Sequence, residues 1–450
     1  MSLRERLSSV EDTKKFTGTD NVLSKNTYSE LKKHIHASVL ERINLERLRE
    51  HSQQQVKKEI NDLVTVIVDE EKIALNQFER KNLAQDIEHE MFGLGPLEPL
   101  LLDPTISDIL INGYKQVYIE RKGKLELTAV EFQDNNHLLN IIERIVSRVG
   151  RRIDESSPMV DARLADGSRV NAIIPPLALD GPVVSIRRFS VNPLMVNDLL
   201  RINSITTEMA SLISAVAKSK INAVISGGTG SGKTTLLNLI SGFIPEDERI
   251  VTIEDAAELQ MRQPHIVRLE TRPPNIEEKG EVTQRALVRN ALRMRPDRII
   301  LGEVRGPEAL DMLQAMNTGH EGSFATIHAN TPRDAIARME NMVSMAGATL
   351  TMLAVRQQIA SAINMIIQVS RLTDGTRKVV SIQEITGMEG ETITMQEIFG
   401  FKQTGVGEDG KIKGHYYATG LVPHFNKRLK AFGVGLPEAM FNPAVRYEVG

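Results

Sequence analysis

Apolar residues recur at helical spacing in the first part of the chain. Between Tyr28 and about Phe92 there are three stripes, and within each an apolar residue recurs about every three or four positions. The stripes are Leu31/Ile35/Val39/Ile43, Val56/Ile60/Leu63/Val64/Ile67 and Phe78/Leu83/Ile87/Met91. This period predicts amphipathic helices, and helices with short connections predict a small bundle over residues 28–92. Residues 1–27 are rich in Ser, Thr, Lys and Asp, so we expect a flexible tail there. The pattern does not tell whether the bundle does more than pack or link.

Residues 93–192 alternate short apolar runs with turns that contain glycine. The helical pattern ends at residues 93–96, and strands are expected over 106–112, 117–121 and 125–132. Asp134 is a candidate cap for a helix that ends at Gly150. Further strands are expected on both sides of the Asp166-Gly167 turn and over 183–189. These elements predict a mixed α/β domain, followed by a linker over residues 193–207.

From residue 208 to 450, strand patterns alternate with helical ones. Strands are expected over residues 221–226, 249–253, 298–302, 323–327 and 365–369. Helices between them, such as 307–317 and 332–345, predict a mostly parallel sheet. Past Arg371 the chain turns at Asp374-Gly375 and becomes rich in strands. The expected class is therefore α/β.

Composition narrows the classes of function. The chain has 450 residues, of which 41% are hydrophobic and 25% charged, as in a soluble globular protein of two or three domains. No apolar run is long enough to span a bilayer, and the N-terminus lacks the apolar core of a signal peptide; the cytoplasm is the expected compartment. The lack of cysteine excludes disulfides, thiolate zinc sites and cysteine nucleophiles. A net charge of −3, 4% aromatic residues and no tryptophan disfavour a nucleic-acid partner.

The most specific motif follows the strand expected at 221–226. Residues 227–234 read GGTGSGKT and fit the P-loop pattern G-x-x-x-x-G-K-[ST]. Glycines let backbone N–H groups curl around phosphate oxygens, and the next helix points its positive end at the same anion. Lys233 can reach the β- and γ-phosphates, and the Thr234 hydroxyl can bind Mg²⁺. The candidate nucleotide-binding residues are Gly227, Gly228, Thr229, Gly230, Ser231, Gly232, Lys233, Thr234 and Thr235.

Two carboxylates stand at the ends of expected strands. A P-loop enzyme needs one carboxylate for the metal ion and one for the attacking water. Glu303 follows the strand at 298–302, and Glu254 follows the strand at 249–253. A single surface Glu is usually just solvated, but two such residues beside a P-loop favour a catalytic role. His328 ends a further strand, where it is either a γ-phosphate sensor or a structural histidine.

Arginines 285, 289 and 293 are spaced four apart and share one helix face. A solvated stripe is the favoured interpretation; a subunit interface and an anionic contact stay open.

Together these motifs resemble those of the type II/type IV secretion ATPases. The matching segments are the P-loop, the Asp box at 252–255 (TIED), an atypical Walker B at 300–305 (ILGEVR) and the His box at 318–328. The resemblance covers about residues 95–430. Within the family, the segments at 152–158 and 161–171 and the helical extension are most similar to the CpaF group, the assembly ATPases of Tad (Flp) pili.

The resemblance implies a homo-hexamer in which, within each subunit, a small PAS-like α/β domain closes over a RecA-like domain. It also implies that this hexamer couples ATP hydrolysis to pilus assembly through an inner-membrane platform protein. It makes Glu254 the general base and has Glu303 hold Mg²⁺ through water. Arg169 and Arg187 match the phosphate-binding arginines of the small domain. Arg188 is adjacent to Arg187 and would point the other way along a strand, so the choice between the two stays open.

Departures from the family pattern favour assembly. The chain cannot build the four-cysteine zinc module common in type II secretion and type IV pilus ATPases, and it lacks the C-terminal motif of the retraction ATPases. The alternatives are a type IV secretion ATPase, a DNA- or RNA-translocating RecA-like motor, and a nucleotide-gated scaffold that does not hydrolyse ATP.

Overall fold

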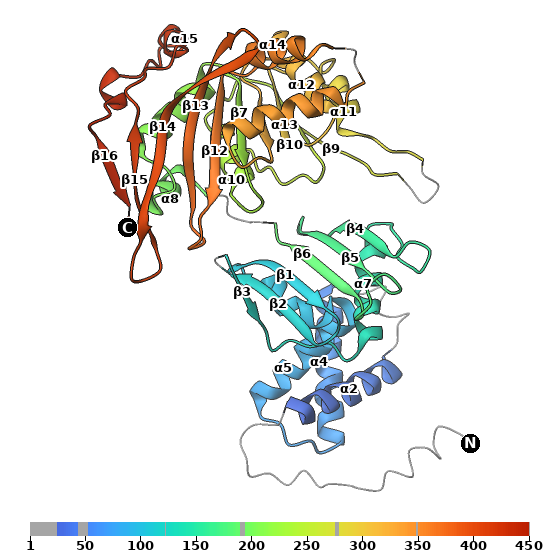
Figure 1. Ribbon diagram of the computed structural model, residues 1–450. Coiled ribbons are helices and arrows are strands. Elements are labelled where there is room, and N and C mark those ends of the chain that lie inside the picture. The colour runs from blue at the N-terminus through green and yellow to red at the C-terminus, as the bar shows by residue number, and fades with distance from the viewer. Residues whose placement is uncertain are drawn as a thin grey trace. The chain divides into compact units, whose positions relative to one another are not determined.

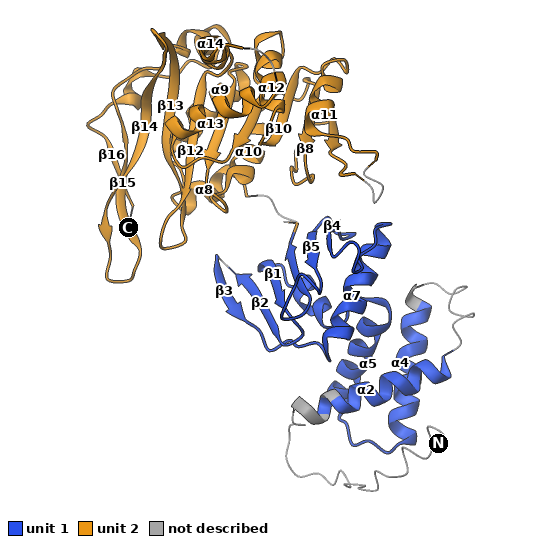
Figure 2. Cartoon of the chain, turned by 45° about the vertical axis from the view of Figure 1, so that its right-hand side comes forward, with its two compact units in different colours: residues 1–188 blue, residues 189–450 orange. Residues whose placement is uncertain are grey.

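The computed structural model describes residues 25–43, 53–121, 123–189, 194–274, 279–347 and 350–449. The chain divides into two compact units, residues 1–188 and residues 189–450 (Figure 2). The tail predicted over residues 1–27 lies outside the described residues except for its last three, which begin helix α2.

The helical bundle lies where the apolar stripes predict it. Its helices are α2 (Lys25–Arg42), α4 (Gln53–Glu70) and α5 (Gln77–Phe92) (Figure 1). Residues from all of them are buried in one core, among them Ile35, Ile60 and Ile87. Helix α5 begins with a capping box, in which the side chain of Asn76 accepts from the Glu79 N–H and the Glu79 carboxylate accepts from the Asn76 N–H.

The small α/β domain is built on a six-stranded antiparallel sheet with the order β3-β2-β1-β6-β5-β4. The strands are β1 (Ile106–Asn112), β2 (Gln116–Arg121), β3 (Lys124–Leu127), β4 (Met159–Arg163), β5 (Arg169–Ile173) and β6 (Val183–Arg187). Helix α7 (Asn135–Arg148) packs its apolar stripe into the core of this sheet. The predicted cap is confirmed, because the Asp134 side chain accepts from the His137 N–H at 2.7 Å. Helices η1 (Gly95–Leu97) and α6 (Glu98–Leu102) lead into β1.

A buried carboxylate joins the bundle to this domain. Glu90, near the end of α5, bonds to Lys32 of α2 at 2.8 Å and to His137 of α7 at 2.9 Å. Burial opposes ionisation of Glu90, but the hydrogen bonds from His137 and Lys32 outweigh it and lower the pKa to about 2. Arg144 of α7 also donates to the carbonyls of Glu90 and Gly93, both at 2.7 Å. The bundle is thus part of the same compact unit.

Residues 189–450 form a ten-stranded sheet with the order β16-β15-β14-β13-β12-β7-β11-β10-β8-β9. Six neighbouring strands, β12, β7, β11, β10, β8 and β9, are parallel. Strands β13 to β16 extend this sheet beyond β12 in antiparallel fashion. The parallel strands are β7 (Ala223–Gly227), β8 (Ile250–Glu254), β9 (Ile266–Glu270), β10 (Arg298–Val304), β11 (Phe324–Ile327) and β12 (Met365–Arg371). The antiparallel ones are β13 (Arg377–Glu389), β14 (Thr392–Val406), β15 (Ile412–Ala418) and β16 (Arg446–Val449). The predicted parallel sheet and its strand-rich C-terminal part are confirmed; edge strand β9 was not predicted.

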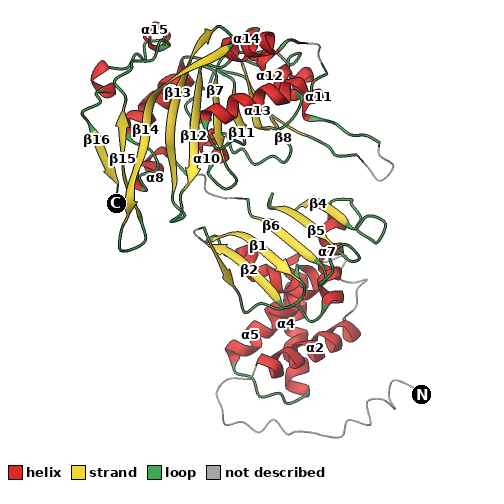
Figure 3. Ribbon diagram, viewed as in Figure 1, coloured by secondary structure: helices red, strands yellow, loops and turns green. Residues whose placement is uncertain are grey.

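Helices cover both faces of the parallel strands (Figure 3). One face carries α9 (Thr207–Lys218) and α10 (Lys233–Ser241). The other carries α11 (Gln284–Ala291), α12 (Glu308–Asn317), α13 (Pro332–Ser344) and α14 (Met352–Ala362). Shorter helices are α8 (Val196–Arg201), α15 (Asn426–Ala431) and η2 (Glu438–Phe441). Helix α8 lies inside the range 193–207 that the sequence predicted as a linker. No helix within the described ranges has the length and apolar character needed to cross a membrane.

The arginines of α11 contact the next helix. Arg285 and Arg289 both bind Asp311 of α12, at 2.7 Å and 3.5 Å. The solvated stripe favoured from the spacing is therefore wrong for Arg285, which joins α11 to α12.

Candidate nucleotide-binding site

The P-loop connects buried strand β7 to helix α10 in a conformation that needs glycine. Gly230 and Gly232 have φ angles of +67° and +101°, which residues with a Cβ rarely adopt. At Gly227, an added Cβ would come within 2.5 Å of the Val369 carbonyl of β12. At Gly228 the space is open, with no atom within 4 Å of such a Cβ. The loop therefore curls tightly against β12 while one side stays accessible.

Positive charge gathers over this loop. The Lys233 ammonium donates to the carbonyls of Gly227 and Gly228, each at 3.0 Å. Lys233 is also the first residue of α10, so the N-terminal end of that helix faces the same loop. Thr234 and Thr235 follow in its first turn and are partly exposed, whereas Thr229 is exposed in the loop. A curled backbone, an ammonium group and a helix N-terminus together fit a phosphate chain.

Four neighbouring parallel strands end at this edge of the sheet. Strand β11 lies between β7 and β10, and β8 pairs with the far side of β10. At these strand ends lie the P-loop, His328, Glu303 and Glu254, of which Glu303 is the last but one residue of β10. Both carboxylates stand at strand ends, as the sequence predicted, and the structure shows in addition that the two strands are neighbours. Gly302 makes room for this arrangement, since a Cβ there would lie 2.8 Å from Cγ of Glu254.

Glu254 has the environment of a general base. The residue is 3% exposed. One carboxylate oxygen, Oε2, accepts from the N–H groups of Glu258 and Leu259 at 2.7 Å and 3.0 Å. The other oxygen, Oε1, is buried and has no hydrogen-bond partner. Burial raises the pKa of Glu254 to about 6, against the two backbone hydrogen bonds. A carboxylate that is ionised at neutral pH, yet more basic than usual, suits removal of a proton from water.

This pKa predicts a pH dependence. A base works in its ionised form, and the fraction of ionised Glu254 falls as the pH drops through about 6. We expect kcat/KM for ATP to fall about tenfold per unit below that pH, because kcat/KM reports the free enzyme. The rate should be measured from pH 5 to 8 at saturating Mg²⁺, with the protonation of ATP itself subtracted. If kcat/KM instead fell only near pH 4.5, the ordinary pKa of a glutamate, the assignment of Glu254 as the base would be contradicted.

Glu303 is ion-paired with Arg305, which sequence reasoning did not assign to the site. Arg305 Nη2 lies 2.6 Å from Glu303 Oε2, and Nη1 lies 3.5 Å from Asp255 Oδ2. The hydrogen bond to Glu303 raises the pKa of the Arg305 guanidinium. A cation that binds at Glu303 would therefore share its carboxylate with Arg305. The signal in the sequence was an arginine two positions after the strand-end Glu.

The donor set fits Mg²⁺ that is bound through phosphates. In the part of the chain that the structure describes, no three His, Asp or Glu side chains are grouped to hold a metal ion. Mg²⁺ usually takes one or two protein oxygens and completes its shell with water and phosphate oxygens. Thr234 and Glu303 can supply such oxygens, and their assignment as metal ligands stays a prediction.

His328 is held in the neutral form. Burial and the nearby Lys233 charge lower its pKa, so at neutral pH it offers one neutral N–H rather than a cation. The chain after it is fixed by Gln368 of β12, whose amide donates to the carbonyls of Ala329 and Asn330 at 3.2 Å and 3.0 Å. The sequence did not indicate this role of Gln368, because β12 is distant in sequence from His328. The sensor role of His328 stays a prediction.

Arg169 and Arg187 belong to the other unit, where they are direct cross-strand partners on β5 and β6. Arg187 has a 59% exposed side chain, 3.3 Å from Asp108. Arg188 is half-buried and donates to the backbone carbonyls of Leu100, at 3.4 Å, and Asp103. Of the two, Arg187 has the more accessible guanidinium, whereas Arg188 is used to hold the chain before β1.

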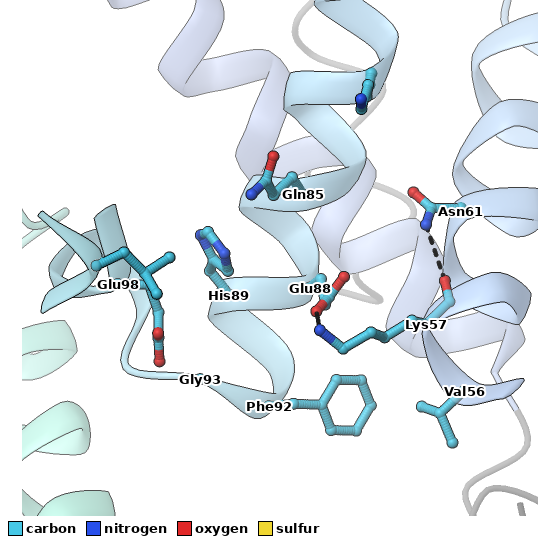
Figure 4. Close-up of a pocket in the computed structure, with 11 residues that line it drawn as sticks. Val56, Lys57, Asn61, Gln85, Glu88, His89, Phe92, Gly93 and Glu98 are labelled. Atoms are coloured by element: carbon cyan, nitrogen blue, oxygen red, sulfur yellow. Dashed lines mark hydrogen bonds and ion pairs between the residues drawn. The ribbon is translucent and has the colours of Figure 1, made fainter. Parts of the chain in front are cut away.

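A separate hollow of about 910 Å³ lies in residues 1–188. Figure 4 shows it between α4, α5 and the turn after α5, where Lys57 and Glu88 form an ion pair. None of the residues that the sequence assigned to the nucleotide site lines it.

Known proteins match most of the chain. A family model described as "Type II/IV secretion system protein" matches residues 90–410. A Mycobacterium tuberculosis protein, whose name assigns it provisionally to conjugal transfer, is 39% identical over 299 residues, which are 65% of this chain and 84% of that protein. The type IV secretion system protein VirB11 of Brucella suis is 31% identical over 314 residues, which are 63% of this chain and 87% of that protein. The solved structure of the VirB11 ATPase from Brucella suis, in complex with sulphate, is 29% identical, covers 66% of this chain and 94% of that one, and has a TM-score of 0.35.

Proposed function

The chain belongs to the type II/type IV secretion system protein family, and we propose on that premise that it is a hexameric ATPase that drives assembly of a Tad (Flp) pilus. The observation that carries the ATPase proposal is the buried Glu254, which has one unpaired oxygen and lies at the end of β8, with two strands between it and the P-loop strand β7. Work would be delivered to an inner-membrane platform protein from the cytoplasmic side. No nucleic-acid partner is proposed.

Each site residue has a proposed role. The N–H groups of residues 227–235 and Lys233 bind the phosphates of ATP. Thr234 and Glu303 would hold Mg²⁺, which when bound neutralises phosphate charge. Glu254 removes the proton of the attacking water, and His328 donates to the γ-phosphate. Arg169 and Arg187 are proposed as phosphate contacts supplied by the small domain.

The pilus, rather than another secretion system, is supported by what lies outside the family match. That match begins at residue 90, so α2, α4 and nearly all of α5 precede it. This bundle is bonded into the small domain through Glu90, and a helical extension supports the resemblance to the CpaF group together with the segments at 152–158 and 161–171. The second candidate is a type IV secretion or conjugation ATPase, which the names of the relatives favour.

The two candidates predict different losses in cells. We expect a strain whose only copy carries Glu254→Gln to lack surface pili by electron microscopy, with conjugation and effector secretion at the level of the wild-type strain. The purified wild-type protein should show Mg²⁺-dependent turnover in a six-subunit species that single-stranded or duplex DNA does not stimulate.

Loss of conjugation with pili intact would overturn the pilus proposal in favour of type IV secretion. Strong stimulation by DNA would favour a nucleic-acid translocase, and tight ATP binding without phosphate release would favour a non-hydrolysing scaffold.

A further inference from the structure

The hairpin of β12 and β13 lies against the P-loop. Strand β12 pairs with β7 up to Val369 and Gly227, and at its end Arg371 pairs with Arg377 of β13. Arg377 Nε donates to the carbonyl of Gly230 at 2.8 Å. A Cβ on Gly230 would lie 3.5 Å from Arg371 Nη1, and one on Gly232 would lie 3.5 Å from Arg377 Cδ. Two arginines distant in sequence therefore touch the phosphate loop.

The bond from Arg377 sets the direction of one peptide group. The C=O and N–H of a trans peptide point in opposite directions. With the Gly230 oxygen turned toward Arg377, the Ser231 N–H points to the other side of the loop, where it reaches the Gly228 carbonyl at 3.4 Å. The Lys233 ammonium reaches the same carbonyl at 3.0 Å. The Ser231 N–H thus faces the side on which Lys233 lies, where a P-loop binds phosphate.

The peptide between Gly230 and Ser231 needs a hydrogen bond from outside the loop to keep its direction. Gly230 has a φ of +67°, and glycine rotates between left- and right-handed conformations with little penalty. A rotation at Gly230 would turn the Ser231 N–H away from Lys233. A hydrogen bond from a charged donor to the Gly230 carbonyl opposes that rotation.

Arg377 can hold the Gly230 carbonyl in place because its own backbone is fixed. Its carbonyl accepts from the Ser204 hydroxyl at 2.6 Å, and the Val379 N–H donates to the Ser204 carbonyl at 2.9 Å. In the turn before it, Asp374 accepts from the Thr376 N–H and from the Ile412 N–H of β15, both at 2.9 Å. The side chain therefore extends from a hairpin that is bonded on two sides.

We propose that Arg377 is a positioning residue for nucleotide binding, which acts through the Ser231 N–H by holding the Gly230 carbonyl. The proposal rests on the P-loop being the ATP site. Because the Ser231 N–H would contact phosphate before and during hydrolysis alike, Arg377 contributes to affinity and not to the chemical step. It is thereby distinguished from Lys233 and Glu254.

The test compares Arg377→Met, Arg377→Lys and the control Arg201→Met in the full-length chain. Arg201 lies on α8 with a 76% exposed side chain paired to Asp198. We expect R377M to raise KM for ATP and Kd for ADP together, by about tenfold, with kcat within about twofold of wild type. R377K should fall between R377M and wild type, since an ammonium can donate to the carbonyl but lacks the fixed direction of a guanidinium. R201M should match wild type.

Unchanged KM and Kd in a folded R377M would overturn the proposal, and so would a loss of kcat at constant KM. If R377M does not fold, the test rests on R377K. An ADP affinity of R377K equal to that of wild type would then overturn the proposal. ADP titration separates this inference from the proposed function. A chain that binds ADP without hydrolysing ATP would refute the ATPase, while the effect of R377M on ADP affinity would still test Arg377. A wild-type chain that binds no ADP would overturn both.

Discussion

Replacing Lys233 with alanine is expected to abolish ATP hydrolysis, lowering kcat/KM by at least about 100-fold, while the fold is retained. The ammonium is the positive charge that the P-loop itself supplies, and it donates to the carbonyls of Gly227 and Gly228. Its loss removes charge from the place where phosphate charge would be neutralised. The side chain is only partly buried, so the thermal midpoint should change by less than about 3 °C. Phosphate release and a thermal unfolding curve measure the two quantities.

The matched control is Lys218→Ala, at the exposed last turn of α9 in the same unit. It removes an identical charge away from the site and should leave turnover unchanged. If K233A hydrolysed ATP at the wild-type rate, the P-loop would not be the nucleotide site, and the roles proposed for Glu254 and Glu303 would be withdrawn with it.

Residues that end a strand could be predicted from the sequence because their position depends on local pattern alone. Glu254, Glu303 and His328 each stand at the end of an apolar run that is a strand in the structure, and Lys233 begins the helix that follows another such strand. In a parallel sheet the ends of neighbouring strands meet at one edge. The pattern therefore indicated both the residues and their common edge, although it did not give the order of the strands.

The residues that were missed act through neighbours far away in sequence. Arg377 reaches Gly230 across 147 positions, and Gln368 reaches Ala329 across 39. Neither contact leaves a period or a spacing in the sequence, because it exists only once β12 lies beside β7. Arg305 was closer, but nothing in the motif tells whether an arginine faces the adjacent carboxylate or the solvent.

Edge and connecting elements were the weakest part of the fold prediction. Strand β9 is partly exposed along its whole length, so it lacks the continuous apolar run by which β7 and β8 were found. Helix α8 spans only six residues, less than two turns, which is too short for a helical period to show. In both cases tertiary contacts rather than local pattern stabilise the element.

Glu254→Gln should separate catalysis from binding. The amide oxygen of glutamine can still accept from the N–H groups of Glu258 and Leu259, so the side chain should keep its place. Glutamine cannot take a proton from water, and loss of a general base lowers kcat by about 100- to 10,000-fold. Kd for ATP should stay within about threefold of wild type, because the site loses no phosphate contact. Single-turnover hydrolysis and ATP titration measure these separately.

The control Glu258→Gln changes a neighbouring carboxyl but not the backbone N–H that Glu254 uses, so its turnover should equal that of wild type. Glu303→Gln tells the two strand-end carboxylates apart, since loss of a metal ligand should raise the Mg²⁺ concentration needed for half-maximal turnover. E254Q should leave that concentration unchanged. If E254Q kept the wild-type kcat while E303Q lost it at every Mg²⁺ concentration, the base would be Glu303. The unpaired oxygen of Glu254 would then reflect burial alone.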